Sequence, residues 1–230
     1  MSNRLTLLIG ILTLFAVSCQ KSSNDWKELV TDDHLVGWKV LGGEGSYEVK
    51  NGEVVGTTKG TSNTFLATEN TYENFILELE VLVDPKMNSG IQFRSNQNER
   101  GVVNGYQAEI DPSERAWSGG LYDESRRGWL YPLTTNQAGQ KAFKNNQWNK
   151  YRIEAFDNKV QIWVNDVMTT HFQDSMATKG FIALQVHGVG TKEEEGLQVK
   201  WRNIRMLENI KKTDLTPAVE DVTLTDLSTL

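Results

Sequence analysis

Long polar side chains occupy every second position in three segments of the chain, residues 88–95, 105–112 and 180–188. The polar positions are Gln92, Arg94, Gln107, Glu109, Asp111, Gln185 and His187. In a β-strand alternate residues point to the same side, so each segment would present these groups on one face. Amide, guanidinium and carboxylate groups on one face can satisfy many hydroxyls of a sugar. The alternative is an ordinary solvated face, which favours Thr, Ser and Lys, but this face has hardly a lysine.

Residues 115–133 are expected to form a loop that closes over this polar face. The Gly119-Gly120 pair permits an irregular backbone there. The flat rings and cations of the segment are Trp117, Tyr122, Trp129, Tyr131, Arg126 and Arg127. The alternative is a long hairpin whose aromatic residues only cover the edge of the fold. The acidic pair Asp123 and Glu124 is expected to be solvated.

The rest of the chain has the alternation that is typical of antiparallel strands. In residues 75–83 (FILELEVLV), apolar residues share one face and two glutamates share the other. Turn-forming pairs at 51–52, 157–158 and 165–166 predict tight hairpins. No stretch between residues 26 and 207 predicts a long amphipathic helix. We therefore expect an all-β fold, a two-sheet antiparallel β-sandwich.

The N-terminus has the layout of a bacterial signal peptide, expected over residues 1–18. Arg4 supplies its positive charge, and the apolar stretch 5–17 is shorter than the roughly 20 residues needed to span a bilayer. The only cysteine, Cys19, follows where a lipobox places the lipidated residue. The alternative is an ordinary cleaved signal with a chance cysteine. We expect a lipoprotein of the cell envelope, anchored through Cys19 at the outer membrane or the periplasmic face.

The mature chain is expected to hold one domain. Residues 19–25 would be a lipidated tether, 26–207 the β-sandwich and 208–230 a polar tail. A length of about 210 residues suits one all-β core. Loss of Arg4 takes the formal net charge from −6 to about −7, which argues against nucleic acid or anionic lipid as a partner. The lipid anchor would then be the only membrane contact.

The order of several segments resembles the 3-keto-disaccharide hydrolase domain family, long known as a domain of unknown function. The matching segments are WKV, YEV, NGEVVG, NSGIQFRS, GYQAEIDP, GGLYDESRRGWL, WNKYRIEAFDNKVQIWVND, GFIALQVHG and VKWRNIRM. The resemblance covers about residues 26–207, and it implies a jelly roll similar to concanavalin-type lectins and glucanases. The opening WKELVTDDHLVGWKV is a loose version of the family's start, and the lipobox lacks its usual leucine.

The resemblance also implies action on glycosides that are oxidised at C3 of the sugar ring. A ketone at C3 makes the C2 hydrogen acidic, because the remaining carbanion is delocalised as an enolate. A base that removes this hydrogen drives loss of the group on C1, and later addition of water makes the net change a hydrolysis. The reaction needs a base near C2, a donor near the C3 oxygen and an acid near the glycosidic oxygen.

The polar face supplies candidates for these roles. Glu109 or His187 is the expected base, Arg94 and Gln92 are the expected donors to the ketone oxygen or to hydroxyls, and Tyr122 is a possible acid or positioning group. Further sugar contacts are expected from Gln107, Asp111, Gln185, Trp117, Arg127 and Trp129.

A metal ion is an alternative for the same face. Glu109, Asp111 and His187 together would suit Mn, Co or Zn as a Lewis acid, because imidazole and carboxylates are ligands of these metals. Otherwise Asp111 would orient His187 or contact a hydroxyl. A divalent metal is the only cofactor that these residues suggest.

Three other functions fit the same pattern. A non-catalytic, lectin-like lipoprotein would use the same polar and aromatic groove to capture an oligosaccharide. Ordinary glycoside hydrolysis would pair Glu109 with Asp111, whose Cα atoms lie roughly 7 Å apart along a strand. Two carboxylates on one strand cannot readily flank a glycosidic bond from opposite sides, however. A plain envelope scaffold would leave the polar face without a purpose.

Overall fold

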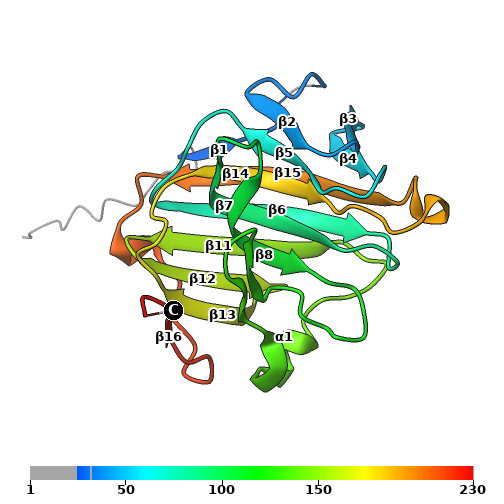
Figure 1. Cartoon of the computed structure of the whole chain (residues 1–230). Helices are drawn as coiled ribbons and strands as arrows, with labels where there is room; N and C mark the ends of the chain where they lie inside the picture. Colours follow the sequence, from blue (N-terminus) through cyan, green and yellow to red (C-terminus); the bar gives the residue numbers. More distant parts are fainter. Residues whose placement is uncertain (1–24, 32, 230) are drawn as a thin grey trace, which may run out of the picture.

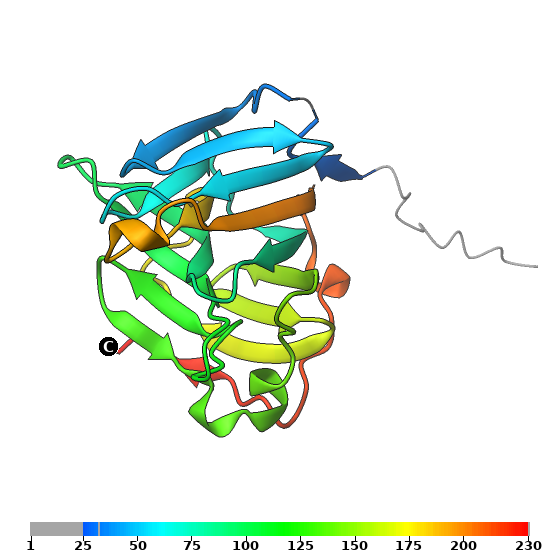
Figure 2. The same cartoon turned by 90° about the vertical axis from the view of Figure 1, so that its right-hand side faces the viewer.

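The computed structural model describes residues 25–31 and 33–229, and most of the regular structure in them is β-strand (Figure 1). The strands form two sheets that stack as two layers, as Figures 1 and 2 show from two directions. Residues 1–24, which hold the expected signal peptide, Cys19 and most of the tether, lie outside the described residues. No helix in the described part of the chain is long and apolar enough to cross a membrane.

The first sheet has nine strands. Its members, in order across the sheet, are β16 (Thr225–Asp226), β13 (Val167–Gln173), β12 (Lys159–Val164), β11 (Asn149–Phe156), β6 (Phe75–Val83), β15 (Gln198–Glu208), β4 (Glu53–Thr57) and β3 (Ser46–Lys50), with β1 (Trp26–Glu28) paired to β15. The pairs are antiparallel except β13 with β16, which is parallel.

The second sheet has seven strands, all paired antiparallel. Its members, in order, are β10 (Gly128–Tyr131), β9 (Leu121–Glu124), β8 (Val103–Ile110), β7 (Ser89–Gln97), β14 (Phe181–Val186), β5 (Thr64–Thr68) and β2 (Trp38–Gly42). Helices are short: α1 (Gln137–Gln140) packs beside β13, and single 3-10 turns span Leu133–Thr135, Lys192–Glu194 and Lys212–Asp214. The predicted all-β antiparallel sandwich is confirmed.

The main core lies between the two sheets, and the alternation of the sequence explains it. Leu77 on β6 and Trp201 on β15 are fully buried from one sheet, and Ile91, Tyr106 and Leu184 are fully buried from the other. Burying each such side chain stabilises the fold by about 1.5–3 kcal/mol. Because every second residue enters this core, the residues between them are left on the outer faces of the sheets.

The three predicted hairpin turns are confirmed. Residues 51–52 link β3 to β4, residues 157–158 link β11 to β12, and residues 165–166 link β12 to β13. Asn51 and Gly52 have positive φ angles of 54° and 78°. These angles match the right-handed twist of a two-residue hairpin, which explains the preference for Asn-Gly.

The strand β7 contains a bulge that changes the direction of one predicted site residue. Its register with β8 shifts between Phe93 and Asn96, and Arg94 has a positive φ of 48°. The Arg94 guanidinium donates to the backbone oxygens of Glu73 and Asp157, in the loop before β6 and the turn after β11. The prediction that Arg94 shares the polar face with Gln92 is therefore wrong, because the bulge breaks the alternation.

The segment expected as a polar tail packs against the nine-stranded sheet. Ile210, Val222 and Leu227 are buried, and β16 extends the sheet beside β13. The side chain of Thr216 donates a hydrogen bond of 2.6 Å to buried Glu154 on β11. These few apolar residues are too widely spaced to give a periodic signal, but they attach the segment to the sandwich.

Candidate functional site

The floor of a cavity lies on the outer face of the seven-stranded sheet, where a strand lacks a side chain. Gly90 on β7 pairs with Gln185 on β14 and with Glu109 on β8. A Cβ atom at Gly90 would lie 2.3 Å from the Cδ atom of Gln107, which folds over this position. The missing side chain therefore makes room for the Gln107 amide in the cavity floor, between Gln185 and Glu109.

A chain of amides in this floor donates hydrogen bonds toward Glu109. The Ser95 hydroxyl donates to Gln92 Oε1, Gln92 Nε2 donates to Gln107 Oε1 at 2.7 Å, and Gln107 Nε2 donates to Glu109 Oε2 at 2.9 Å. Asn88 Nδ2 donates to Glu109 Oε1 at 2.6 Å. Each oxygen of the carboxyl thus accepts from an amide, which favours its charged form.

Burial acts in the opposite direction on the same carboxyl. Glu109 is only 3% exposed, and burial raises its pKa to about 7, although the amides of Asn88 and Gln107 lower it. A carboxyl with a pKa near neutrality exchanges a proton readily at physiological pH, as a general base requires. Glu109 is the described residue of the cavity that best combines this pKa with burial.

Replacing Gln92 with leucine is expected to destabilise the fold and raise the pKa of Glu109 further. Leucine gives Gln107 Oε1 no donor, so a buried acceptor stays unpaired at a cost of about 1–3 kcal/mol. Gln107 is then held less firmly, and weaker donation to the carboxylate raises its pKa. Urea unfolding and the pH dependence of activity report the two effects. The exposed Gln198→Leu variant is the control, and equal results for both variants would contradict this role of Gln92.

Aromatic rings and one arginine form the rim of the cavity on the side of β9 and β10. Tyr122 and Trp129 line it and pack edge to face at 5.2 Å between ring centroids. The Arg115 guanidinium lies 4.8 Å from the Trp129 ring, donates to Asp111 Oδ2 at 2.7 Å and approaches Glu109 Oε1 to 3.8 Å. Stacking and ion pairing therefore hold a cation beside the buried carboxyl.

A further part of the cavity wall is formed by Glu124 at the end of β9 and by Gln185 and His187 at the end of β14. His187 Nδ1 lies 2.7 Å from the backbone oxygen of Gly188, which can only accept, so Nδ1 carries a hydrogen. Gln185 Nε2 meets Glu124 Oε2 at 3.5 Å, across β7 and β8. Burial raises the pKa of Glu124, while the charge of His187 lowers it.

Gln185 leaves one polar atom without a partner. Its side chain is fully buried, and its Oε1 atom accepts no hydrogen bond from the protein. A buried acceptor without a donor is costly, and a ligand hydroxyl can supply that donor. Because Gln185 lines the cavity, this oxygen marks a position for a hydrogen-bonding group of a ligand.

The complete cavity has a volume of about 230 Å³. Its lining residues are Asn63, Asn88, Gln107, Glu109, Arg115, Tyr122, Glu124, Trp129, Gln185 and His187. Six of these lining residues were predicted from the sequence, namely Gln107, Glu109, Tyr122, Trp129, Gln185 and His187. The predicted sugar contact Gln92 lies beneath the cavity and supports Gln107 instead.

Four predicted site residues lie elsewhere or serve another residue. Arg94 binds backbone oxygens away from the cavity, and Arg127 pairs with Asp123 and Asp174. Trp117 packs on Trp129 from outside the lining. Asp111 follows the last residue of β8, and its carboxylate accepts from Ser113 and Arg115.

The proposed metal cluster is not formed. In residues 25–31 and 33–229, no group of three or more His, Cys, Asp or Glu residues is placed to hold a metal ion. Asp111 is the member that breaks the group, because its carboxylate holds Arg115 and not His187. The Arg115 guanidinium lies between the carboxyls of Glu109 and Asp111 and pairs with both.

Four lining residues were missed from the sequence. Asn63, Asn88 and Arg115 lie outside the regular strands, so no alternation marks them. Glu124 was expected to be solvated, but it shares a face of β9 with Tyr122 and lines the cavity. The only signal that could have identified Glu124 is its spacing of two residues from Tyr122.

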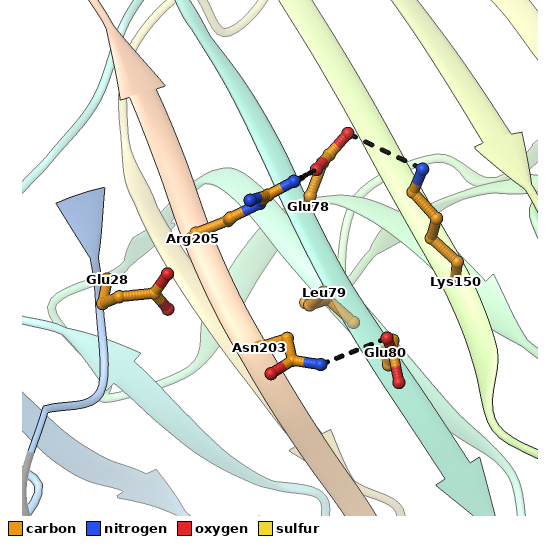
Figure 3. A pocket seen from close by; sticks show the side chains of 7 residues that line it. All are labelled: Glu28, Glu78, Leu79, Glu80, Lys150, Asn203 and Arg205. Carbon is orange, nitrogen blue, oxygen red and sulfur yellow. Dashed lines mark hydrogen bonds and ion pairs between the residues drawn. The ribbon is translucent and has the colours of Figure 1, made fainter. Parts of the chain in front are cut away.

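A separate charged hollow lies on the outer face of the nine-stranded sheet (Figure 3). There, Arg205 Nη2 lies 2.6 Å from Glu78 Oε2, and Lys150 Nζ lies 3.9 Å from Glu78 Oε1. Asn203 Nδ2 donates to Glu80 Oε1 at 3.1 Å. These groups satisfy one another across neighbouring strands, which is typical of a structural ion-pair network.

The chain is an all-β jelly-roll sandwich with a cavity of amide, carboxyl and aromatic groups on one sheet. Residues 25–207 match the family described as the 3-keto-alpha-glucoside-1,2-lyase-like domain. The match spans most of the chain, so this protein belongs to that family, and the resemblance found in the sequence is confirmed. No curated protein matches the chain in sequence.

Solved structures with similar folds support the architecture. One is a Parabacteroides distasonis protein provisionally named a glycosyl hydrolase, with a TM-score of 0.59, 16% identity and coverage of 83% of this chain and 98% of that one. Another is carbohydrate-binding module CBM66 from Bacillus subtilis, with a TM-score of 0.52, 16% identity and coverage of 74% and 94%. At these identities the likeness shows the fold alone.

Proposed function

We propose that this protein cleaves 3-keto-glycosides by removing the proton at C2 of the oxidised sugar. The observation that supports the proposal is the buried carboxyl of Glu109, which has a pKa of about 7 and lies in a cavity of hydrogen-bonding groups. A carbon acid next to a ketone needs a base of this kind. Membership of the 3-keto-alpha-glucoside-1,2-lyase-like family supports the same substrate class.

The reaction divides into two steps with balanced atoms and charges. Glu109 takes the C2 proton, and the electron pair of the C–H bond forms an enolate with the C3 oxygen. The enolate then collapses, the bond from C1 to the glycosidic oxygen breaks, and the leaving alcohol takes a proton. Addition of water across the new C1–C2 double bond places hydroxide on C1 and hydrogen on C2, so the overall change is a hydrolysis.

Two other residues complete the set of roles. Arg115 is the cation next to Glu109, so we assign it to the C3 oxygen, where negative charge develops in the enolate. This role was predicted for Arg94, which the β7 bulge removes from the site. Tyr122 is assigned as the acid for the leaving oxygen, because burial raises its pKa above 10 and keeps the hydroxyl protonated. The remaining groups bind sugar hydroxyls.

The decisive experiment compares a glycoside with its 3-keto counterpart in heavy water, with products followed by mass spectrometry. Cleavage of the 3-keto substrate alone, with one deuterium from solvent at C2, is expected. A 3-keto sugar without protein controls for spontaneous exchange. Equal cleavage of the unoxidised glycoside would contradict the mechanism and favour ordinary hydrolysis.

The kcat/KM for a 3-keto-glycoside is expected to rise with pH, with an apparent pKa near 7. The base acts only when its carboxyl is ionised, and burial raises the pKa of Glu109 to about 7, so kcat/KM falls below this pH. The raised pKa of Tyr122 keeps the acid protonated well above it. Measuring kcat/KM from about pH 4 to 9 checks the prediction. An apparent pKa of 4.5 in this profile, the ordinary glutamate value, would contradict the role of burial.

A non-catalytic sugar-binding protein is the second candidate. The unpartnered Gln185 oxygen favours binding of a hydroxyl without requiring any reaction. Titration calorimetry with the 3-keto substrate separates the candidates: binding without turnover by the natural protein would establish the lectin-like function and remove the enzymatic one.

We also propose that the protein is exported and held in the cell envelope through lipid on Cys19. The proposal rests on the sequence of residues 1–19. Cys19→Ser is expected to move the protein from the membrane fraction to the soluble envelope fraction. An unchanged membrane fraction would contradict the lipid anchor.

A further inference from the structure

A second cavity adjoins the first on the same side of the molecule. It has a volume of about 570 Å³, more than twice that of the first, and it shares Asn63, Glu124 and His187 with it. Asn63 connects the two sides of this boundary, since its Oδ1 accepts from Gly188 N and its side chain also bonds to Glu124. The two cavities are therefore neighbours across one polar boundary.

The wall of the second cavity differs from that of the first. Phe65 on β5, Val102 and Val103 supply apolar surface, and Val102 is 42% exposed. By contrast, the first cavity is lined almost entirely by amide, carboxyl and other polar groups. The second cavity thus fits a group with a flat apolar face as well as hydroxyls or an ether oxygen at its edge.

Close backbone contact gives the second cavity its shape. Gly42 ends β2, and Gly43 follows it beside the loop that holds Ser62 and Asn63. A Cβ atom at Gly43 would lie 2.2 Å from the Ser62 carbonyl oxygen, and one at Gly42 would lie 2.5 Å from that of Asn63. Only glycine permits this approach, so this part of the wall is built into the backbone.

We propose that the second cavity binds the leaving half of the substrate, an alcohol component with a flat apolar face such as a second sugar ring or an aromatic ring. The assignment rests on the proposed function, because it takes the first cavity as the site of the oxidised sugar. The glycosidic oxygen then lies at the boundary of Asn63, Glu124 and His187. Tyr122 lies two residues before Glu124 on the same face of β9 and lines the first cavity, and we assign it to protonate that oxygen.

The consequence is a preference for glycosides with a large leaving group. A methyl 3-keto-glycoside would leave the second cavity filled with water. A 3-keto-disaccharide or a phenyl 3-keto-glycoside would displace this water and contact Phe65 and Val102. Contact that persists into the transition state raises kcat/KM. We expect kcat/KM to be about tenfold or more higher for the larger substrates, which corresponds to about 1.4 kcal/mol.

Filling the cavity tests this assignment. Val102→Trp is expected to remove most of the difference in kcat/KM between the two larger substrates, the disaccharide and the phenyl glycoside, and the methyl substrate. Val219→Trp is the matched control, because Val219 is also 42% exposed but lies outside both cavities. If the variant lowers kcat/KM for the disaccharide alone, the occupant is a sugar. If it lowers kcat/KM for the phenyl glycoside alone, the occupant is an aromatic ring.

Binding measurements keep this proposal separate from the proposed function. Calorimetry of Glu109→Gln compares the binding affinities of unoxidised methyl and disaccharide glycosides without turnover. Adding Val102→Trp to this variant is expected to abolish the difference in affinity. If the natural protein cleaves no 3-keto-glycoside but this difference persists, only the reaction is wrong. If Val102→Trp changes neither the kinetic nor the binding preference, the second cavity does not hold the leaving half.

Discussion

Glu109→Gln is expected to lower kcat/KM on a 3-keto-glycoside by about 10²–10⁴-fold, the range for loss of a general acid or base. Glutamine has the shape of the carboxyl but cannot take the C2 proton. Only Asn88 must turn over to accept from the new amide, while Gln107 keeps donating to its oxygen, so the cavity keeps its form. Steady-state kinetics gives the loss, and calorimetry should give little change in binding.

The same variant is expected to be more stable above pH 7. Burial raises the pKa of Glu109 from an ordinary 4.5 to about 7, so folding disfavours the charged form. The native protein therefore loses stability as pH rises from 4.5 past 7, by up to about 3 kcal/mol. Glutamine removes this loss. The unfolding free energy of Glu109→Gln should therefore exceed that of the natural protein at pH 8 but not at pH 4.

Two outcomes would contradict these roles of Glu109. Full activity of Glu109→Gln would show that another group is the base, with His187 the next candidate in the cavity. Loss of activity together with loss of stability at pH 8 would show that the variant disrupts the site instead of only removing a base. Glu48→Gln, at an exposed carboxyl that pairs with Lys50 in the other sheet, controls for removal of a charge.

The alternation of the sequence was sufficient to predict the sheets and much of the site. Leu77 and Glu78 on β6 are neighbours that face the core and the outer surface, as their polarity indicates. The same rule placed Glu109 and Gln185 on one face of the second sheet. The alternation rule works because one face of each strand is buried in the core, where an unpaired polar residue would strongly destabilise the fold.

The prediction failed where the backbone departs from a regular strand. The bulge in β7 turned Arg94 away, and β8 ends before Asp111, so strand parity no longer set the direction of either side chain. Asn63, Asn88 and Arg115 come from three separate loops. Their meeting in one cavity depends on the packing of distant segments, which local sequence patterns do not encode.

Arg94→Ala is expected to destabilise the fold by about 3–5 kcal/mol. Its fully buried guanidinium binds the backbone oxygens of Glu73 and Asp157, so removing it creates a cavity and leaves these acceptors unpaired. Arg94→Lys should also lose stability, because an ammonium lacks the planar fork that reaches both oxygens. Urea unfolding measures the change, with Arg100→Ala, exposed on the same β7–β8 hairpin, as control. A catalytic role would instead lower activity at unchanged stability, so the pair of measurements separates an arginine that holds two sheets together from one that handles substrate.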